Sequence, residues 1–148
     1  MPFVLNATRQ TATVLLIDDE ASVRTLFGSV LRVLGCRVLE APNGERALRM
    51  LADGQEAVSL IFLDWRMPVM GGADFCDAYH AAAGDNAVPI VAICSNTDDV
   101  GPHRGVVKQV LGKPISIHDI VDIVEGALSG AGWTPRGLDG LPPAPERD

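Results

Sequence analysis

The chain has 148 residues, 47% of them hydrophobic, and a formal net charge of −7. This length and composition predict one domain with a single buried core. The Lys and Arg residues form no cluster that could follow a phosphate backbone, and no segment is long enough to cross a bilayer, so we expect no direct nucleic-acid binding and no membrane contact. The N-terminus lacks a secretory pattern, so a cytoplasmic protein is expected.

The predicted elements alternate between strands and helices from residue 14 onward. The apolar run 14–17 predicts a strand buried on both faces, and apolar residues then recur with helical spacing until Gly35 ends the helix. A weaker strand is predicted at residues 38–39, and Asn43 is placed to cap a second helix. The predicted buried faces of the two helices comprise Val23, Leu26, Phe27, Val30, Leu31 and Leu34 in the first, and Ala47, Leu48 and Leu51 in the second.

The middle of the chain continues this alternation. The apolar run 60–63 predicts a second strongly buried strand. A third helix is predicted over Gly72–Ala83, where Gly-Asp-Asn at residues 84–86 then breaks it. The run 90–93 predicts another buried strand, because it is again short, continuous and apolar.

The last predicted elements are less regular. The segment 96–105 contains Gly101 and Pro102, so a helix there must be short or irregular. A weaker strand is predicted at residues 106–111, and Ser116 is placed to cap a final helix. Strands and helices that alternate in this way predict an α/β fold with right-handed crossovers and a doubly wound parallel sheet. The apolar positions of the final helix are Ile117, Ile120, Val121, Val124 and Leu128.

Carboxylates follow two of the predicted strands. Asp18 and Asp19 come directly after the run 14–17, and Asp64 follows the run 60–63. In a parallel sheet, ligands bind beyond the carboxyl ends of the strands, so these acids are expected to converge. Converging carboxylates repel one another unless a cation neutralises them, and Mg²⁺ accepts such oxygen ligands while leaving room for water and phosphate. The pattern predicts a magnesium and phosphate site.

Three segments resemble the signature blocks of the response-regulator receiver domain of two-component signalling. They are VLLIDDE at residues 14–20, FLDWRMPVMGG at 62–72 and GKPI at 112–115, in this order and each at a predicted strand end. The similarity implies a five-stranded sheet in the flavodoxin-like order 2-1-3-4-5, with helices on both faces. It divides the chain into an N-terminal extension at 1–12, a receiver domain at 13–128 and a disordered Gly/Pro-rich tail at 129–148.

The resemblance also implies a chemistry. Asp64 would be the phosphoacceptor, attacking the phosphorus of a phosphohistidine on a histidine kinase or a histidine phosphotransfer protein. Asp19, Asp64 and the backbone carbonyl of Arg66 would hold Mg²⁺, and Asp18 would bind it through water. The chain would then be a phosphoacceptor signalling protein in a phosphorelay, not an enzyme acting on other substrates, and it would signal to an unidentified downstream protein or relay the phosphate.

The lysine at the end of the last predicted strand completes the implied site. Lys113 would pair with a phosphoryl oxygen and, before phosphorylation, with Asp64; family members often hold the bond between this lysine and the following proline cis. Each residue also has a simpler interpretation. Asp18 and Asp19 could cap the first helix, Asp64 could be a turn residue, and Lys113 alone would most often be a solvated surface lysine.

The chain departs from the family pattern at two positions. Cys94 occupies the place of a Thr or Ser whose hydroxyl bonds the aspartyl phosphate, and a thiol is a much weaker donor. Ser95 could serve instead if the strand end shifted by one residue, but such a slip turns a side chain to the opposite face, so Cys94 is the favoured switch position. Val110 stands where many members carry an inward-turning Tyr or Phe.

Three functions are compatible with these residues. A stand-alone phosphorylated receiver is favoured by Asp19, Asp64 and Lys113. A pseudo-receiver, which keeps the fold as an interaction module without phosphorylation, is suggested by the two departures. A small Mg²⁺-dependent phosphohydrolase with an aspartyl-phosphate intermediate is the third. Such enzymes carry Asp-x-Asp after the first strand, whereas Asp18 and Asp19 are adjacent here.

Overall fold

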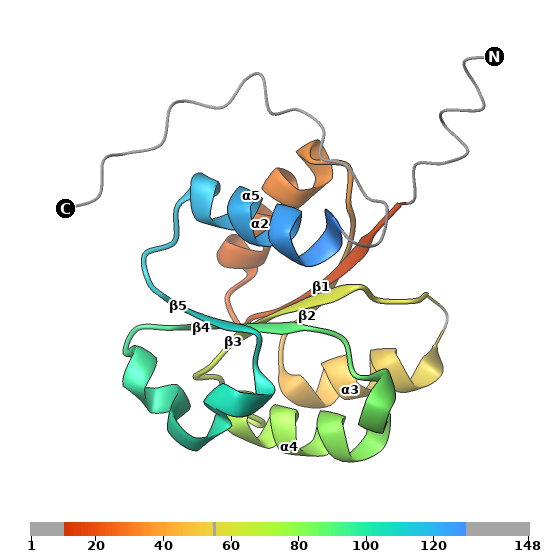
Figure 1. Ribbon diagram of the computed structural model, residues 1–148, viewed down its shortest axis with the longest axis vertical. Helices are drawn as coiled ribbons and strands as arrows, with labels where there is room; N and C mark the ends of the chain where they lie inside the picture. Colours follow the sequence, from red (N-terminus) through yellow and green to blue (C-terminus); the bar gives the residue numbers. More distant parts are fainter. Residues whose placement is uncertain (1–10, 55, 130–148) are drawn as a thin grey trace.

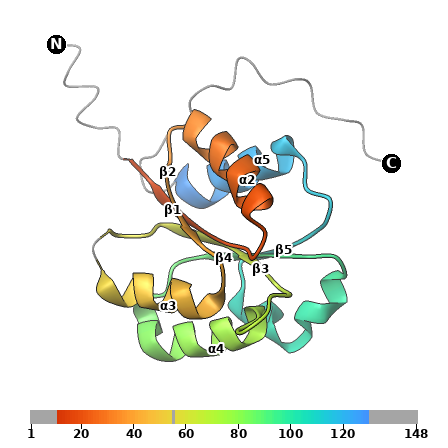
Figure 2. The ribbon, with the colours of Figure 1, turned by 180° about the vertical axis from the view of Figure 1, so that it is seen from behind.

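The computed structural model describes residues 11–54 and 56–129. This part of the chain forms a parallel five-stranded sheet in the order β2-β1-β3-β4-β5, which confirms the predicted doubly wound α/β fold and its strand order. Helices α2 and α5 cover one face of the sheet, and α3, α4 and the 3₁₀ segment η2 cover the other (Figures 1 and 2). Such coverage of both faces explains why the central strands read as continuous apolar runs.

The strands align their carboxyl ends at one edge of the sheet. Every residue of β1, β3 and β4 is buried, whereas the outer strands β2 and β5 are partly exposed. The register places Ile17 opposite Leu63, and Cys94 opposite Gly112. The residues that directly follow the strands are therefore brought close together at this edge of the sheet. The bounds are β1 (Thr13–Ile17), β2 (Arg37–Ala41), β3 (Leu60–Asp64), β4 (Ile90–Cys94) and β5 (Gln109–Gly112).

The helices begin and end largely where local signals predict. The Asn43 side chain accepts a hydrogen bond from the Arg46 amide at 2.8 Å, and Ser116 and Asp119 form a capping box. Gly35, with a φ of 96°, follows the first helix. The helices and 3₁₀ segments are α2 (Ala21–Val33), α3 (Gly44–Asp53), α4 (Gly72–Ala83), η1 (Gly84–Asn86), η2 (Thr97–Val106) and α5 (Ile117–Leu128).

The segment after β4 is irregular, as its glycines and proline predict. The 3₁₀ segment η2 is kinked at Gly101, whose φ of 44° and ψ of −116° are not helical. It extends to Val106, which the sequence pattern assigned to the last strand. The strand β5 consequently starts at Gln109 and is only 4 residues long.

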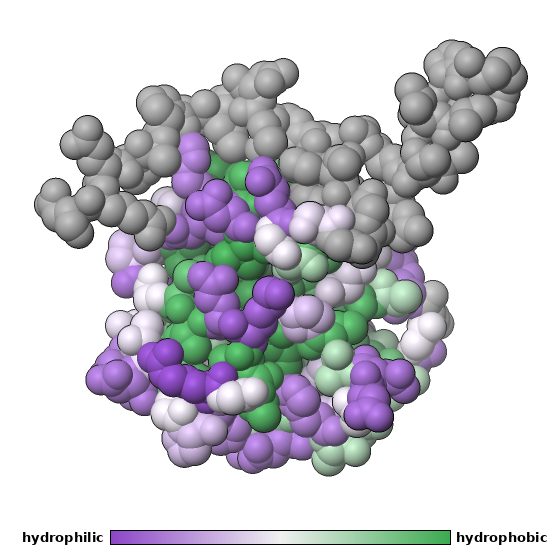
Figure 3. All heavy atoms as spheres, viewed as in Figure 1, coloured by the Kyte–Doolittle hydropathy of each residue, from purple (hydrophilic) through white to green (hydrophobic). Residues whose placement is uncertain are grey.

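Two hydrophobic clusters lie on opposite faces of the sheet. Leu16 and Phe62 pack beneath α2 and α5. The ring of Phe27 in α2 meets the Phe62 ring edge-on, with 5.9 Å between the ring centroids. Leu15 and Cys94 belong to the second cluster, beneath α3 and α4. In Figure 3, hydrophobic side chains reach the surface across the middle of the molecule, between hydrophilic side chains above and below.

One prediction of burial is wrong. Leu26 follows the spacing of the predicted buried face, but its exposed fraction is 62%; Ile117, an apolar position of the last helix, is 38% exposed. Helical spacing identifies residues that share a face, whereas burial also needs a neighbouring element over that part of the face. Leu26 instead borders the loop after β5, together with Lys113 and Ile115.

The ends of the chain fall mostly outside this description. The predicted extension 1–12 and tail 129–148 are described only at Thr11, Ala12 and Ser129. Among the described residues, no helix combines the length and the apolar character that a membrane span requires.

Candidate functional site

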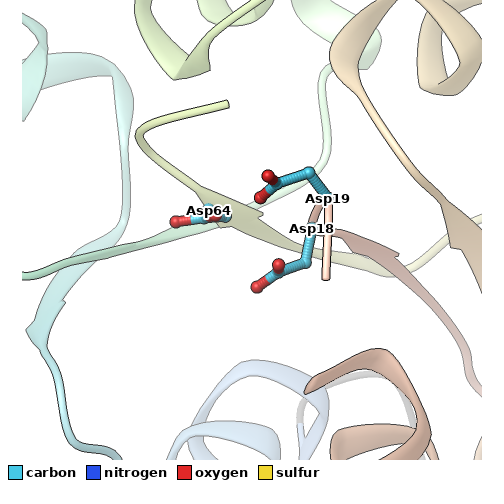
Figure 4. Close-up of side chains that lie close together, drawn as sticks. All are labelled: Asp18, Asp19 and Asp64. Atoms are coloured by element: carbon cyan, nitrogen blue, oxygen red, sulfur yellow. The ribbon is translucent and has the colours of Figure 1, made fainter. Parts of the chain in front are cut away.

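Three carboxylates meet at the carboxyl edge of the sheet. Asp18 and Asp19 follow β1, and Asp64 is the last residue of β3 (Figure 4). One carboxylate oxygen from each lies within 4.8 Å of the others. Asp18 and Asp64 are 6% and 4% exposed, whereas Asp19 is exposed to solvent. The structure thus brings together the acids that the strand-end pattern predicts to converge.

Backbone hydrogen bonds continue past the strands and fix these positions. The Asp18 amide donates to the Ala41 carbonyl at 3.1 Å, and the Trp65 amide donates to Ile93 at 2.9 Å. The Asp18 carboxylate accepts from the Glu20 amide at 2.9 Å. Glu20 is itself the N-cap of α2 and makes no side-chain cap bond. The simpler interpretation of Asp18 and Asp19 as caps of this helix is therefore wrong.

The surroundings of Asp18 and Asp64 disfavour their ionised forms. Burial, and next the charge of Asp18, raise the pKa of Asp64 to about 6, against the opposing effect of Lys113. Burial also raises the pKa of Asp18, although the Glu20 amide and Lys113 oppose this. A site where acids are held together against their mutual repulsion is suited to a cation.

Lys113 reaches the acids from the end of β5. Its Nζ lies 3.2 Å from Asp64 Oδ1, and its amide donates to the Cys94 carbonyl at 2.9 Å. Burial alone would lower the pKa of Lys113, but Asp64 and then Asp18 raise it above its ordinary value. The peptide bond to Pro114 is cis. The structure thus pairs Lys113 with Asp64, as the resemblance implies for the unphosphorylated protein.

The two residues after Asp64 contact the 3₁₀ segment η2 through Asp99. Arg66 donates from Nη2 and Nε to Asp99 Oδ2, at 2.7 Å and 3.0 Å, and Trp65 Nε1 donates to the Asp99 carbonyl at 3.2 Å. The Trp65 ring is buried against Gly72, where a Cβ atom would overlap it. Sequence reasoning missed Asp99, because the position of a carboxylate in an irregular segment leaves no signal in the sequence.

The proposed switch position lies at the end of β4, inside the cluster beneath α3 and α4. Cys94 is 2% exposed, and its Sγ lies 3.9 Å from the Leu111 carbonyl. Burial, and then the charge of Asp99, raise the pKa of its thiol. Ser95 is exposed, and Val110 is half-buried against the same cluster.

The match to a family model decides the assignment. Residues 14–125 match the model of the response regulator receiver domain. The chain belongs to this family. The matched region contains all three acids and Lys113. Membership of the receiver family therefore explains both the fold and the cluster of acids at the carboxyl ends of the strands.

The chain is similar in sequence to segments of longer known proteins. The chain is 30% identical, over 118 residues, to the sensor histidine kinase CheAY of Helicobacter pylori; the alignment covers 78% of this chain and 15% of the kinase. It is 25% identical over 123 residues to the phosphate regulon transcriptional regulatory protein PhoB of Pseudomonas aeruginosa, covering 81% of this chain and 53% of PhoB. The chain therefore spans a small part of CheAY and about half of PhoB.

Solved structures show the same fold. The chemotaxis response regulator CheY4 of Vibrio cholerae superposes with a TM-score of 0.72 and 25% identity, covering 80% of this chain and 100% of CheY4. The response regulator TrrA of Thermotoga maritima, solved in complex with Mg²⁺ and BeF, has a TM-score of 0.71 and 22% identity over 80% of this receiver and 100% of TrrA. That similarity is evidence for the fold.

Proposed function

We propose that this receiver accepts a phosphoryl group from a phosphohistidine onto Asp64. The observation that supports the proposal is the contact between buried Asp64 and Lys113, with two further carboxylates alongside. In the proposed step, an Asp64 oxygen attacks the phosphorus, the P–N bond breaks, and the histidine nitrogen leaves with its electron pair. Such transfer needs in-line positioning and neutralised charge more than covalent help from the protein.

Mg²⁺ fits the donor set of this edge of the sheet. Carboxylate oxygens and a backbone carbonyl are suitable ligands for it, and because burial and then the charge of Asp18 raise the pKa of Asp64, a bound cation would favour the ionised form of this acid. We assign Asp19, Asp64 and the Arg66 carbonyl as its ligands, with Asp18 bound through water. The cation would supply neutralising charge to the phosphoryl oxygens. Lys113 would turn from Asp64 toward one of those oxygens.

The surface beside the site fits a protein donor. A groove of about 500 Å³ runs between α2 and the loop after β5, and it reaches from Asp18 and Lys113 to the exposed side chain of Leu26. A histidine that approaches Asp64 past Asp18 and Lys113, which line this groove, would bring its own protein against it. An exposed apolar side chain next to a charged site is the kind of anchor that protein interfaces use. We therefore assign histidine kinases or histidine phosphotransfer proteins as donors.

Mass spectrometry of the intact protein tests the acceptor. After incubation with Mg²⁺ and acetyl phosphate, the wild type should carry one acid-stable, base-labile phosphoryl group, and Asp64→Asn should carry none. Asp122→Asn, which removes an exposed carboxylate from α5, should behave as the wild type. A phosphorylated Asp64→Asn protein would disprove the assignment.

The buried thiol at Cys94 favours a second candidate, the pseudo-receiver. If neither acetyl phosphate nor a phosphorylated histidine kinase modifies the wild type while Mg²⁺ still binds, the fold serves as an interaction module instead. Hydrolysis of small phosphate esters with many turnovers would instead indicate a phosphohydrolase, because a receiver turns over only its own phosphoryl group.

A further inference from the structure

We propose that Asp99 is a positioning residue, which holds Arg66 in the unphosphorylated protein and yields it to a phosphoryl group on Asp64. This inference rests on the proposed phosphorylation of Asp64. It assigns a role to the η2 segment, which connects β4 to β5 and replaces a regular helix.

The carboxylate and the carbonyl of Asp99 bind the two residues that follow the acceptor, while its amide donates to the Asn96 carbonyl at 3.0 Å. The Oδ2 atom of Asp99 accepts both hydrogen bonds from the Arg66 guanidinium. The backbone carbonyl of Asp99 accepts the hydrogen bond from the Trp65 indole N–H. Asp64 lies opposite Ile93 in the paired strands, and Asp99 follows β4 by a few residues. The Arg66 guanidinium is thus held at the same edge of the sheet as the acceptor, by a carboxylate from the neighbouring strand's loop.

The bond between Arg66 and Asp99 is suited to exchange. Arg66 is 77% exposed and Asp99 is 25% exposed. Ion pairs that face solvent contribute little to stability, so breaking this one costs little. A phosphoryl group offers nearly two negative charges and three acceptor oxygens, which a guanidinium binds in a fork. A phosphoryl group two residues from Arg66 therefore competes effectively with a single carboxylate oxygen.

Release of the Asp99 carboxylate would free the Arg66 side chain without detaching η2. The Asp99 carbonyl would keep its bond from the Trp65 indole, Val100 is fully buried, and beyond the kink at Gly101 His103 Nε2 lies 3.0 Å from Asp77 Oδ1 of α4. Phosphorylation would therefore redirect Arg66 while η2 keeps its path. This exchange uses neither Cys94 nor Val110.

Titration with beryllofluoride in the presence of Mg²⁺ tests the exchange in the full-length chain. Trp65 fluorescence reports binding, and a Trp133→Phe background removes the other tryptophan. Asp99→Asn removes the competing charge while the backbone carbonyl that binds Trp65 remains. Because the wild type must break the Arg66 pair to bind the anion and the variant need not, Asp99→Asn should bind it about two- to fivefold more tightly.

Two controls separate this effect from a general change of charge. Asp98→Asn makes the same substitution on the neighbouring exposed residue and should leave the affinity within twofold of the wild type. In an Arg66→Gln background, Asp99→Asn should have no effect, because the residue acts through Arg66. Equal effects of the two Asn substitutions, or an effect that persists without Arg66, would overturn the inference. Wild type that binds no beryllofluoride and accepts no phosphoryl group would contradict the proposed function itself.

Discussion

Asp64 is held in surroundings that oppose its ionisation. It is buried at the end of β3, near Asp18 and Asp19, and Lys113 forms an ion pair with it. Its pKa of about 6 means that the free receiver holds a carboxylate at neutral pH at a cost in stability. Functional sites often carry such a cost, which a ligand then offsets.

The substitution Asp64→Asn should therefore stabilise the metal-free protein at neutral pH. Because the folded pKa lies above the ordinary value of 3.8, the stabilising contribution of the protonated acid is complete below pH 3.8 and is lost as pH rises through about 6. Asn does not titrate, so the variant should gain about 1–3 kcal/mol in free energy of unfolding at pH 7.5 and nothing at pH 4. Urea denaturation with EDTA at both pH values measures this gain. A gain independent of pH would refute the explanation.

A hydroxyl in place of the Cys94 thiol should donate a hydrogen bond to a phosphoryl group on Asp64. The side chain is buried at the end of β4, one residue after the Ile93 that pairs with Asp64. We expect Cys94→Thr and Cys94→Ser to bind beryllofluoride about tenfold more tightly, because a hydroxyl donates to a charged acceptor far better than a thiol does. Cys94→Val introduces a side chain of the same shape as Thr but without a hydrogen-bond donor, so it should not tighten the binding of beryllofluoride. Equal affinities for all three variants would show that this strand end does not reach the anion.

At the scale of elements, helix α2 has one face in the core and another at the surface. Its residues Phe27 and Leu31 are buried, whereas its residues Leu26 and Val33 are 62% and 58% exposed. These two exposed residues line different hollows: Leu26 borders the groove that contains Lys113, and Val33 borders a smaller one with Ile117. Only the first of these adjoins the proposed acceptor.

This difference offers a matched pair of substitutions. Leu26→Asn should slow phosphoryl transfer from a phosphorylated histidine kinase by about tenfold, because it removes an apolar anchor from the proposed donor interface. Val33→Asn makes the same chemical change on the same helix and should leave that rate unchanged. Neither variant should alter phosphorylation by acetyl phosphate, which needs no protein interface. A loss with both donors would mean that Leu26 supports the site itself.

Sequence reasoning succeeded for elements with one dominant signal. Buried parallel strands are continuous apolar runs, and the helix α4 was predicted with the bounds that the structure has. It failed where a neighbouring element decides the outcome. Leu26 keeps the spacing of a buried stripe, yet nothing in the chain near it specifies that α5 leaves it uncovered. The start of β5 was misplaced because η2 extends to Val106.

At the scale of the whole molecule, the sheet topology determines which functional residues were predictable. Asp64 ends β3, and Asp18 and Lys113 directly follow β1 and β5, so their meeting follows from strand order and register. Asp99 lies in a 3₁₀ segment whose path depends on the kink at Gly101 and on contacts with Trp65. Strand-end chemistry can therefore be predicted from sequence, whereas the residues that position it come from irregular segments and require coordinates.

The order in which the chain is synthesised bears on the pairing of Asp64 with Lys113. The strands β1 and β3, which carry the acids, leave the ribosome before β5, which carries the lysine. A domain generally folds as a unit, so the acids are not held together until the chain as far as β5 has emerged. The sheet that brings the carboxylates to one another thereby also brings Lys113 to them. The folded acidic edge is thus supplied with a positive charge from the moment that it forms.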